Sequence, residues 1–182
     1  MHRGQGTFFL SLLFFTFMSN SLLVEANVGE LGHENLRMYG NIIAQSCDVG
    51  TTNADVHIGD FPQNKFETAG DTSEAKGFDI KLMNCSSGIA GSYITFSGDS
   101  DVTYPDLLAL KDTTGGGSMA SNVAVQILDS KGAPIALNKQ ANLQPLIAGD
   151  NIMHFQLRYK ATNVPVKPGN ANSVMYFDIK YQ

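Results

Sequence analysis

Residues 169–182, the last stretch of the chain, read G-N-A-N-S-V-M-Y-F-D-I-K-Y-Q. Large apolar side chains recur there at every second position, namely Met175, Phe177, Ile179 and Tyr181. The positions between them carry Val174, Tyr176, Asp178 and Lys180. A period of two is typical of a β-strand with one face on a core. The stretch therefore predicts a strand over residues 173–182, which by itself is compatible with an ordinary closing strand of a β-sandwich.

A second alternating stretch lies near the other end of the chain, ahead of the first cysteine. Its apolar face consists of Leu36, Met38, Gly40, Ile42 and Ala44, and its other face of Arg37, Tyr39 and Asn41. A glycine in the middle of an apolar face weakens a strand, because it packs no side chain and loses the most backbone entropy. The glycine is compatible with a bulge or a close backbone crossing. Two terminal strands thus frame the chain.

The first residues have the composition of a secretory leader. Residues 7–24 are mostly apolar, rich in Phe and Leu, and lead to the small residue Ala26. This pattern predicts a signal peptide over residues 1–26. A membrane anchor is the less favoured alternative, because residues 19–21 interrupt a run that is already short for a spanning helix. Residues 27–182 are enough for one domain with its own core.

The two cysteines, Cys47 and Cys85, both follow the predicted leader. An oxidising compartment favours a disulfide between them. By the chain-entropy estimate, closing a loop of about 39 residues would contribute on the order of 4 kcal/mol. Two buried free thiols would suit a cytosolic protein instead, and the sequence has no C-x-x-C redox motif. We therefore predict one structural disulfide.

Between the terminal stretches, short alternating segments are separated by Gly, Pro, Asn and Asp. The segments predicted as strands are 53–61, 78–83, 93–97, 123–127, 134–137 and 153–159. The turn Asp-Ser-Lys-Gly at residues 129–132 predicts a hairpin. No segment after the leader has a convincing helical period. Many short strands separated by turns predict an all-β fold, an antiparallel sandwich.

Motifs for catalysis or for cofactor binding are missing from the sequence. The chain has 17 acidic and 12 basic residues, a formal net charge of −5, and hence no electrostatic reason to bind nucleic acid. Its four histidines are scattered, without a second His or Cys at ligand spacing. The glycines at 115–117 lack the Lys-Ser/Thr of a phosphate loop. The sequence predicts neither an enzyme nor a cofactor or metal site.

The features of both termini, taken together, resemble one known family. The chain has Gly169 fourteen residues from its end, a penultimate Tyr181, a cysteine pair in its first half, and Gly40 seven residues before Cys47. In these features it resembles the subunits of the chaperone–usher pili of Gram-negative bacteria. The likeness is greatest to the minor, adaptor-type subunits of type 1 fimbriae. It covers all of the chain after the predicted leader.

The resemblance implies an incomplete immunoglobulin-like β-sandwich that is completed by a donated strand. A chaperone would lend this strand first, and the N-terminal strand of the incoming neighbour would replace it. The implied organisation is a signal peptide over 1–26, an N-terminal extension that acts as donor strand over 27–44, and a pilin domain over 45–182. The donor face would be Leu36, Met38, Gly40 and Ile42. The groove edge that the chaperone recognises would be Gly169, Met175, Phe177, Ile179 and Tyr181.

The implied partners are a periplasmic pilus chaperone, an outer-membrane usher and neighbouring pilus subunits, and the implied location is the periplasm and then a cell-surface pilus. Residues 163–172 and the L-L-A-L patch at 107–110 look more like an adaptor than a major rod subunit, although rod subunits share the architecture. The alternative function is a self-complemented exported adhesin or carbohydrate-binding β-sandwich domain. Such a domain, unlike a pilus subunit, would be a stable monomer without a partner.

Overall fold

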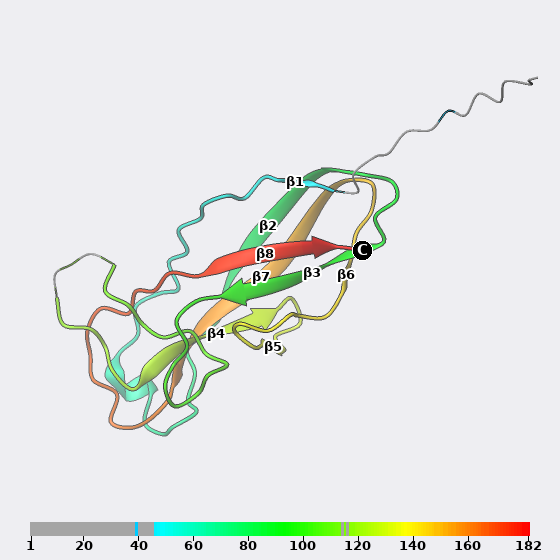
Figure 1. Cartoon of the computed structure of the whole chain (residues 1–182). Helices are drawn as coiled ribbons and strands as arrows, with labels where there is room; N and C mark the ends of the chain where they lie inside the picture. Colours follow the sequence, from blue (N-terminus) through cyan, green and yellow to red (C-terminus); the bar gives the residue numbers. More distant parts are fainter. Residues whose placement is uncertain (1–38, 40–45, 114, 116) are drawn as a thin grey trace, which may run out of the picture. The chain divides into compact units, whose positions relative to one another are not determined.

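The computed structural model describes residue 39, residues 46–113, residue 115 and residues 117–182. Its strands are β1 (Asp48–Val49), β2 (Lys76–Cys85), β3 (Gly91–Ser97), β4 (Val123–Asp129), β5 (Pro134–Ile135), β6 (Gln144–Pro145), β7 (Gly149–Ala161) and β8 (Tyr176–Tyr181). One short 3-10 turn, η1 (Gln63–Lys65), is the only helical element within these ranges. The predicted all-β class is confirmed (Figure 1).

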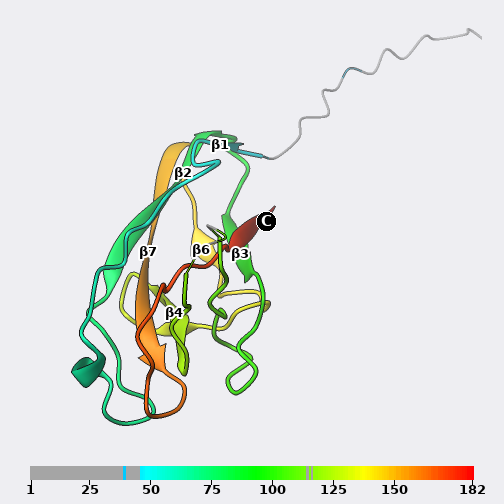
Figure 2. The ribbon, with the colours of Figure 1, turned by 90° about the vertical axis from the view of Figure 1, so that its left-hand side faces the viewer.

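The strands form two antiparallel sheets, which Figures 1 and 2 show as two layers. The larger sheet has the strand order β1-β2-β7-β4-β5, and the smaller has the order β6-β3-β8. The 13-residue β7 runs through the middle of the larger sheet, between β2 and β4. Its cross-strand pair Phe78↔Phe155 fixes the register with β2. The predicted antiparallel sandwich is therefore present.

The core lies between the two sheets and consists of the side chains that the alternation predicted to point inward. Ile80 and Leu82 of β2 are 1% and 0% exposed. Phe96 of β3 packs edge-to-face on Phe155 of β7, with the ring centroids 5.0 Å apart. No buried side-chain nitrogen or oxygen in the described ranges lacks a hydrogen-bond partner. Sheet-on-sheet packing of alternating strands accounts for the core.

β4 is buried on both faces, although its alternation predicted only one buried face. The segment before it folds back onto it, and Leu108 exchanges backbone hydrogen bonds with Val125 at 2.9 Å in both directions. Gln126, in the middle of β4, is 6% exposed and accepts a hydrogen bond from Arg158 Nε at 2.9 Å. Burial of this amide is tolerated because its oxygen is paired.

The prediction of a strand at residues 53–61 is wrong. This segment connects β1 to η1 without joining either sheet. Val56 and Ile58, the residues that suggested the strand, do pack against the core and are partly buried. The alternation thus indicated that one face of an extended segment is half-buried. It did not indicate whether the segment pairs with another strand through backbone hydrogen bonds. The last strand is also shorter than predicted, since β8 begins at Tyr176.

Candidate functional site

β8 is an edge strand that pairs on one side only, with β3. Beside its end, Gln182 and Gly91 exchange both backbone hydrogen bonds, with N–O distances of 2.9 and 3.4 Å. Because antiparallel pairing alternates along a strand, every second residue counted back from Gln182 turns its N–H and C=O toward β3. The residues between them turn their N–H and C=O groups to the other edge of β8, which pairs with no strand of the described chain. These residues are Phe177, Ile179 and Tyr181.

The inward side chains of β8 are covered less well than those of the strand beside it. Ile94 and Phe96 of β3 are both 0% exposed. Their cross-strand partners, Ile179 and Phe177, pack against the same core and yet are only partly buried. Paired residues of neighbouring strands project from the same face of a sheet. The difference in burial therefore arises on the side of β8 away from β3, where a neighbouring strand would lie.

A second row of half-covered apolar side chains comes from the other sheet and from the segment next to its edge. Val56 and Ile58 follow the edge strand β1, and Phe78 lies on β2. All three are partly buried against the core cluster that Phe177 and Ile179 also contact. The sandwich is thus incompletely covered from both layers. Full burial of a half-exposed apolar side chain would remove more apolar surface from water and so contribute further stabilising free energy.

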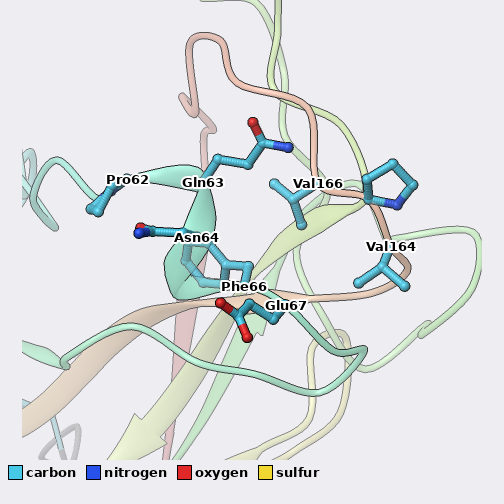
Figure 3. A pocket seen from close by; sticks show the side chains of 8 residues that line it. Pro62, Gln63, Asn64, Phe66, Glu67, Val164 and Val166 are labelled. Atoms are coloured by element: carbon cyan, nitrogen blue, oxygen red, sulfur yellow. The ribbon is translucent and has the colours of Figure 1, made fainter.

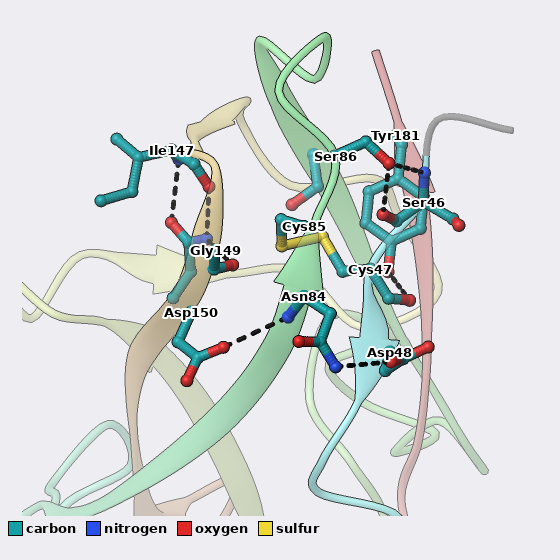
Figure 4. The surroundings of a disulfide bond; sticks show 12 residues. Ser46, Cys47, Asp48, Asn84, Cys85, Ser86, Ile147, Gly149, Asp150 and Tyr181 are labelled. Carbon is teal, nitrogen blue, oxygen red and sulfur yellow. Dashed lines mark hydrogen bonds between the residues drawn. A yellow bond between two sulfur atoms is a disulfide. The ribbon is translucent and has the colours of Figure 1, made fainter. Parts of the chain in front are cut away.

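One end of β8 is tied to the start of the domain near the disulfide (Figure 4). The predicted bond between Cys47 and Cys85 is confirmed. The hydroxyl of Tyr181 donates to the backbone carbonyl of Cys47, with an O–O distance of 3.3 Å. Asn84, at φ 53°, donates from its side chain to Asp48 at 2.9 Å. These contacts hold β8, β1 and β2 together at this end of the sandwich.

Gly169 does not lie on β8 but in the connection that precedes it. A Cβ at this position would come within 2.5 Å of backbone atoms of residues 118–120. Asn170 beside it donates to Ser118 at 2.8 Å and accepts from Ala120 at 2.9 Å. A close approach of two backbones therefore requires the glycine. Of the predicted groove-edge residues, the structure brings together Met175, Phe177, Ile179 and Tyr181, and it places Gly169 apart from them.

The predicted donor residues, Leu36, Met38, Gly40 and Ile42, lie outside the described residues, as do the predicted signal peptide and most of the predicted extension. Within that part of the chain only Tyr39 is described, and its side chain is 84% exposed. The donor assignment consequently stays a prediction. On the accepting side, sequence reasoning missed the role of Val56 and Ile58 as half-covered core residues and the Tyr181–Cys47 hydrogen bond.

An apolar hollow lies away from β8, between η1 and the loop after β7 (Figure 3). It has a volume of about 780 Å³ and is open to solvent. Its lining consists of Pro62, Gln63, Asn64, Phe66, Glu67, Val164, Pro165 and Val166. Phe66 and Val166 are buried and form its base, whereas Val164 is 41% exposed. No sequence pattern predicted this hollow, because its two walls lie about a hundred residues apart in the chain.

The ionisable groups around these surfaces are ordinary surface and packing groups. The carboxylate of Asp99, 2.9 Å from Lys111 Nζ, raises the pKa of that lysine. Burial raises the pKa of Tyr159, whose hydroxyl donates to the carbonyl of Ala171 at 2.9 Å. Among the described residues no three His, Cys, Asp or Glu side chains gather as a metal site would require. In the same ranges no helix has the length and apolar character needed to cross a membrane.

Comparison with known proteins gives a consistent family. The family described as "Fimbrial protein" matches residues 36–182. The fimbrial-like protein YcbU of Escherichia coli K12 is 44% identical over 165 residues, 88% of this chain and 92% of the relative. The S-fimbrial protein subunit SfaG of Escherichia coli O6:K15:H31 is 30% identical over 94% of this chain and 96% of the relative. A Burkholderia pseudomallei type I fimbria protein of known structure is 33% identical, with a TM-score of 0.58, over 75% of this chain and 89% of that chain.

Proposed function

This chain belongs to the fimbrial protein family and is a structural subunit of a pilus, and from that premise we propose that it polymerises by donor-strand exchange with β8 as the accepting edge. The observation that carries the proposal is the contrast in burial across one strand pair. Ile94 and Phe96 are fully buried, while Ile179 and Phe177 beside them are not. An added strand next to β8 would cover these side chains and pair the outward-facing backbone groups.

The donated strand in this proposal is the N-terminal extension, residues 27–44, of the neighbouring subunit. Its apolar face Leu36, Met38, Gly40 and Ile42 extends over a length similar to that of the 6-residue β8. Burial of Leu36, Met38 and Ile42 would contribute about 1.5 to 3 kcal/mol each before costs are subtracted. The sum is comparable with the whole stability of a small domain, about 5 to 15 kcal/mol. Fibres joined in this way would therefore persist through slow release of the strand.

The periplasmic partner we propose is a pilus chaperone that lends a strand to β8 until the subunit reaches an outer-membrane usher. The need for it follows from the exposed edge, since an unpaired strand with half-buried apolar side chains is a site of aggregation. Met175, Phe177, Ile179 and Tyr181 would contact the lent strand. Gly169 would act indirectly, by fixing the connection that leads into β8. Export through the periplasm to a surface pilus belongs to the same proposal.

For the position in the fibre we propose a minor, adaptor-type subunit, on the strength of residues 163–172. The L-L-A-L patch no longer supports this position, because Leu107 and Leu108 are 4% and 3% exposed and belong to the packed interior. Immunogold labelling of purified pili tests the position. Label confined to the fibre tip is expected, and label along the whole shaft would reassign the chain to the major rod.

Size-exclusion chromatography of periplasmic protein tests strand acceptance. Three samples are compared: the chain alone, the chain with a co-expressed pilus chaperone, and a chain carrying a second copy of residues 35–46 after Gln182. We expect the first to aggregate or be degraded, the second to form a one-to-one complex, and the third to be a stable monomer. A chain that is already a stable monomer and gains nothing from either strand would instead be the self-complemented exported domain.

A further inference from the structure

The hollow between η1 and the loop after β7 lies at one end of the sandwich. Figures 1 and 2 both place these two segments at the end of the domain opposite β1. Phe66 and Val166 form its buried apolar base, and Val164 stands exposed at its rim. A hollow with an apolar base gains from an apolar side chain that fills it, because water there has few polar partners.

The opposite end, beside the disulfide, presents an exposed isoleucine. Ile147 is 71% exposed on the turn between β6 and β7, close to the Cys85↔Gly149 pair (Figure 4). The turn is held in place, because the Ile147 N–H donates to Asn151 Oδ1 at 3.0 Å and Asn151 Nδ2 donates to the Ile147 carbonyl at 2.8 Å. A side chain presented on a fixed turn loses little conformational freedom when it is bound.

The direction of the donated strand determines which ends of two subunits meet. β8 runs from Tyr176 toward Tyr181, and Tyr181 lies at the disulfide end because its hydroxyl contacts Cys47. A strand that pairs antiparallel with β8, the more stable arrangement, enters at the Tyr181 end and leaves at the Tyr176 end. Figures 1 and 2 show η1 and the loop after β7, the two walls of the hollow, at the end of the domain where β8 begins.

The linker between the donor face and its own domain is short. Four residues lie between Ile42, the last residue of the predicted donor face, and Cys47. The five steps from Ile42 to Cys47 span about 17 Å when the chain is fully extended. The disulfide end of the donating subunit is therefore kept next to the hollow-bearing end of the accepting subunit. A tether of this length gives two facing surfaces an effective concentration of about millimolar or higher, so that even a small contact is populated.

We propose that, where two copies of this chain follow each other in a fibre, Ile147 of the donating copy seats in the hollow lined by Phe66, Val164 and Val166 of the accepting copy. This contact rests on the proposed donor-strand exchange and adds to it. Its role is to fix the angle between consecutive domains, because a linker alone leaves that angle free. The contact is heterologous and open, and so it repeats along a fibre without closing into a ring.

Cysteine cross-linking tests the contact. The polymers are grown in vitro from the chaperone-bound full chain alone, so that every subunit has only copies of itself as neighbours. The test variant carries Ile147→Cys and Val164→Cys, and the control carries Lys131→Cys, on the exposed β4–β5 turn, with Val164→Cys. After mild oxidation and denaturation without reductant, we expect a ladder of covalent multimers from the test variant only. Polymers that dissociate to monomers from both variants would overturn the contact. Failure of the wild-type chain to polymerise would instead contradict donor-strand exchange itself.

A second measurement avoids new cysteines, which can mispair with Cys47 or Cys85. Ile147→Asp is expected to make the polymers more curved in electron micrographs, while their yield and the chaperone complex stay unchanged. When Val164→Lys is combined with Ile147→Asp, the introduced charges can pair across the contact, and we expect the polymers to be nearly straight again. The control Lys131→Asp is expected to leave the curvature unchanged. Polymers of Ile147→Asp as straight as the wild type would refute the contact.

Discussion

At the scale of single residues, the sequence drew attention to Gly169 by its place near the end of the chain, and the structure explains why a glycine is needed there. Its position fourteen residues from the end suggested a role at the groove edge. In the folded chain it lies before β8, and it is needed because residues 118–120 pass too close for a side chain. Its influence on β8 is therefore indirect, through the connection that positions the strand.

Gly169→Ala is expected to destabilise the domain by about 1 to 3 kcal/mol, the usual cost of overpacking. The matched control is Gly77→Ala, where the added Cβ would meet only the Phe155 carbonyl at 3.8 Å. Urea unfolding of the form with the fused strand measures both variants. Equal stability of the two variants would show that the loop at 118–120 moves aside without cost.

Asp71 gives a prediction about pH. The Thr68 backbone N–H and hydroxyl both donate to its carboxylate at 2.8 Å, and these hydrogen bonds lower the pKa of Asp71 from its ordinary value. Because the folded pKa is the lower one, this stabilisation is present above the unfolded pKa and is lost as the pH falls through the folded pKa. Thr68→Ala removes the hydroxyl donor and keeps the backbone donor, so it should raise the pKa of Asp71 part of the way toward its ordinary value, measured by NMR titration of the carboxyl carbon. An unchanged titration in Thr68→Ala, relative to a Thr103→Ala control, would contradict the assignment of the cause.

At the scale of elements, the disulfide end holds the strands of the domain together, whereas the open edge of β8 is available for pairing. The Cys47–Cys85 bond ties the start of the domain to the end of β2, and the Tyr181 hydroxyl ties β8 to the same place. One end of the sandwich is thus fixed before any partner arrives. The edge of β8 beyond it remains available for a strand.

Replacement of both cysteines by serine is expected to lower the free energy of unfolding by about 2 to 5 kcal/mol. The measurement is the urea midpoint of the form with the fused strand. Dithiothreitol should shift this midpoint for the parent and leave the double serine variant unaffected. A double variant as stable as the oxidised parent would show that the other contacts at this end suffice.

Substitutions along β8 should alternate in their effect on strand binding. Ile179→Asp puts a charge where the half-buried side chain meets the donated strand, whereas Lys180→Asp changes an exposed outward position. We expect Ile179→Asp to weaken binding of a peptide of residues 35–46 by about tenfold or more, since a loss of about 1.4 kcal/mol already gives a factor of ten. Lys180→Asp should bind nearly as the wild type. Similar losses at both positions would argue against binding at this edge.

At the scale of the whole molecule, the two termini have complementary tasks in the proposed assembly, because the first supplies a strand and the last accepts one. Deletion of residues 27–44 separates them. The shortened subunit is expected to bind its chaperone as before and to accept a strand, but to donate none. When it is added to a polymerising mixture, the mean fibre length measured by electron microscopy should fall as the fraction of shortened subunits rises. Fibres of unchanged length would show that residues 27–44 are not the donor.

The alternation of apolar residues predicted which side chains of β2, β7 and β8 point inward, because a period of two is a local property that survives folding. The cysteine pair and the all-β class were also predictable, from composition and turn residues. The same alternation at 53–61 gave a wrong strand, since a pattern reports burial and not the presence of a hydrogen-bonding neighbour. The burial of both faces of β4 could not be predicted either, because the covering segment comes from elsewhere in the chain.

What the sequence determined by itself is therefore local: the inward faces, the turns, the disulfide and the family features of the two ends. The tertiary structure decided which strand is left at an edge, how unevenly β3 and β8 are buried, and that Pro62–Phe66 meets Val164–Val166 in a hollow. These properties depend on which segments become neighbours after folding. Sheet order and end-to-end surfaces are set by contacts between residues distant in the chain, and no local pattern encodes them.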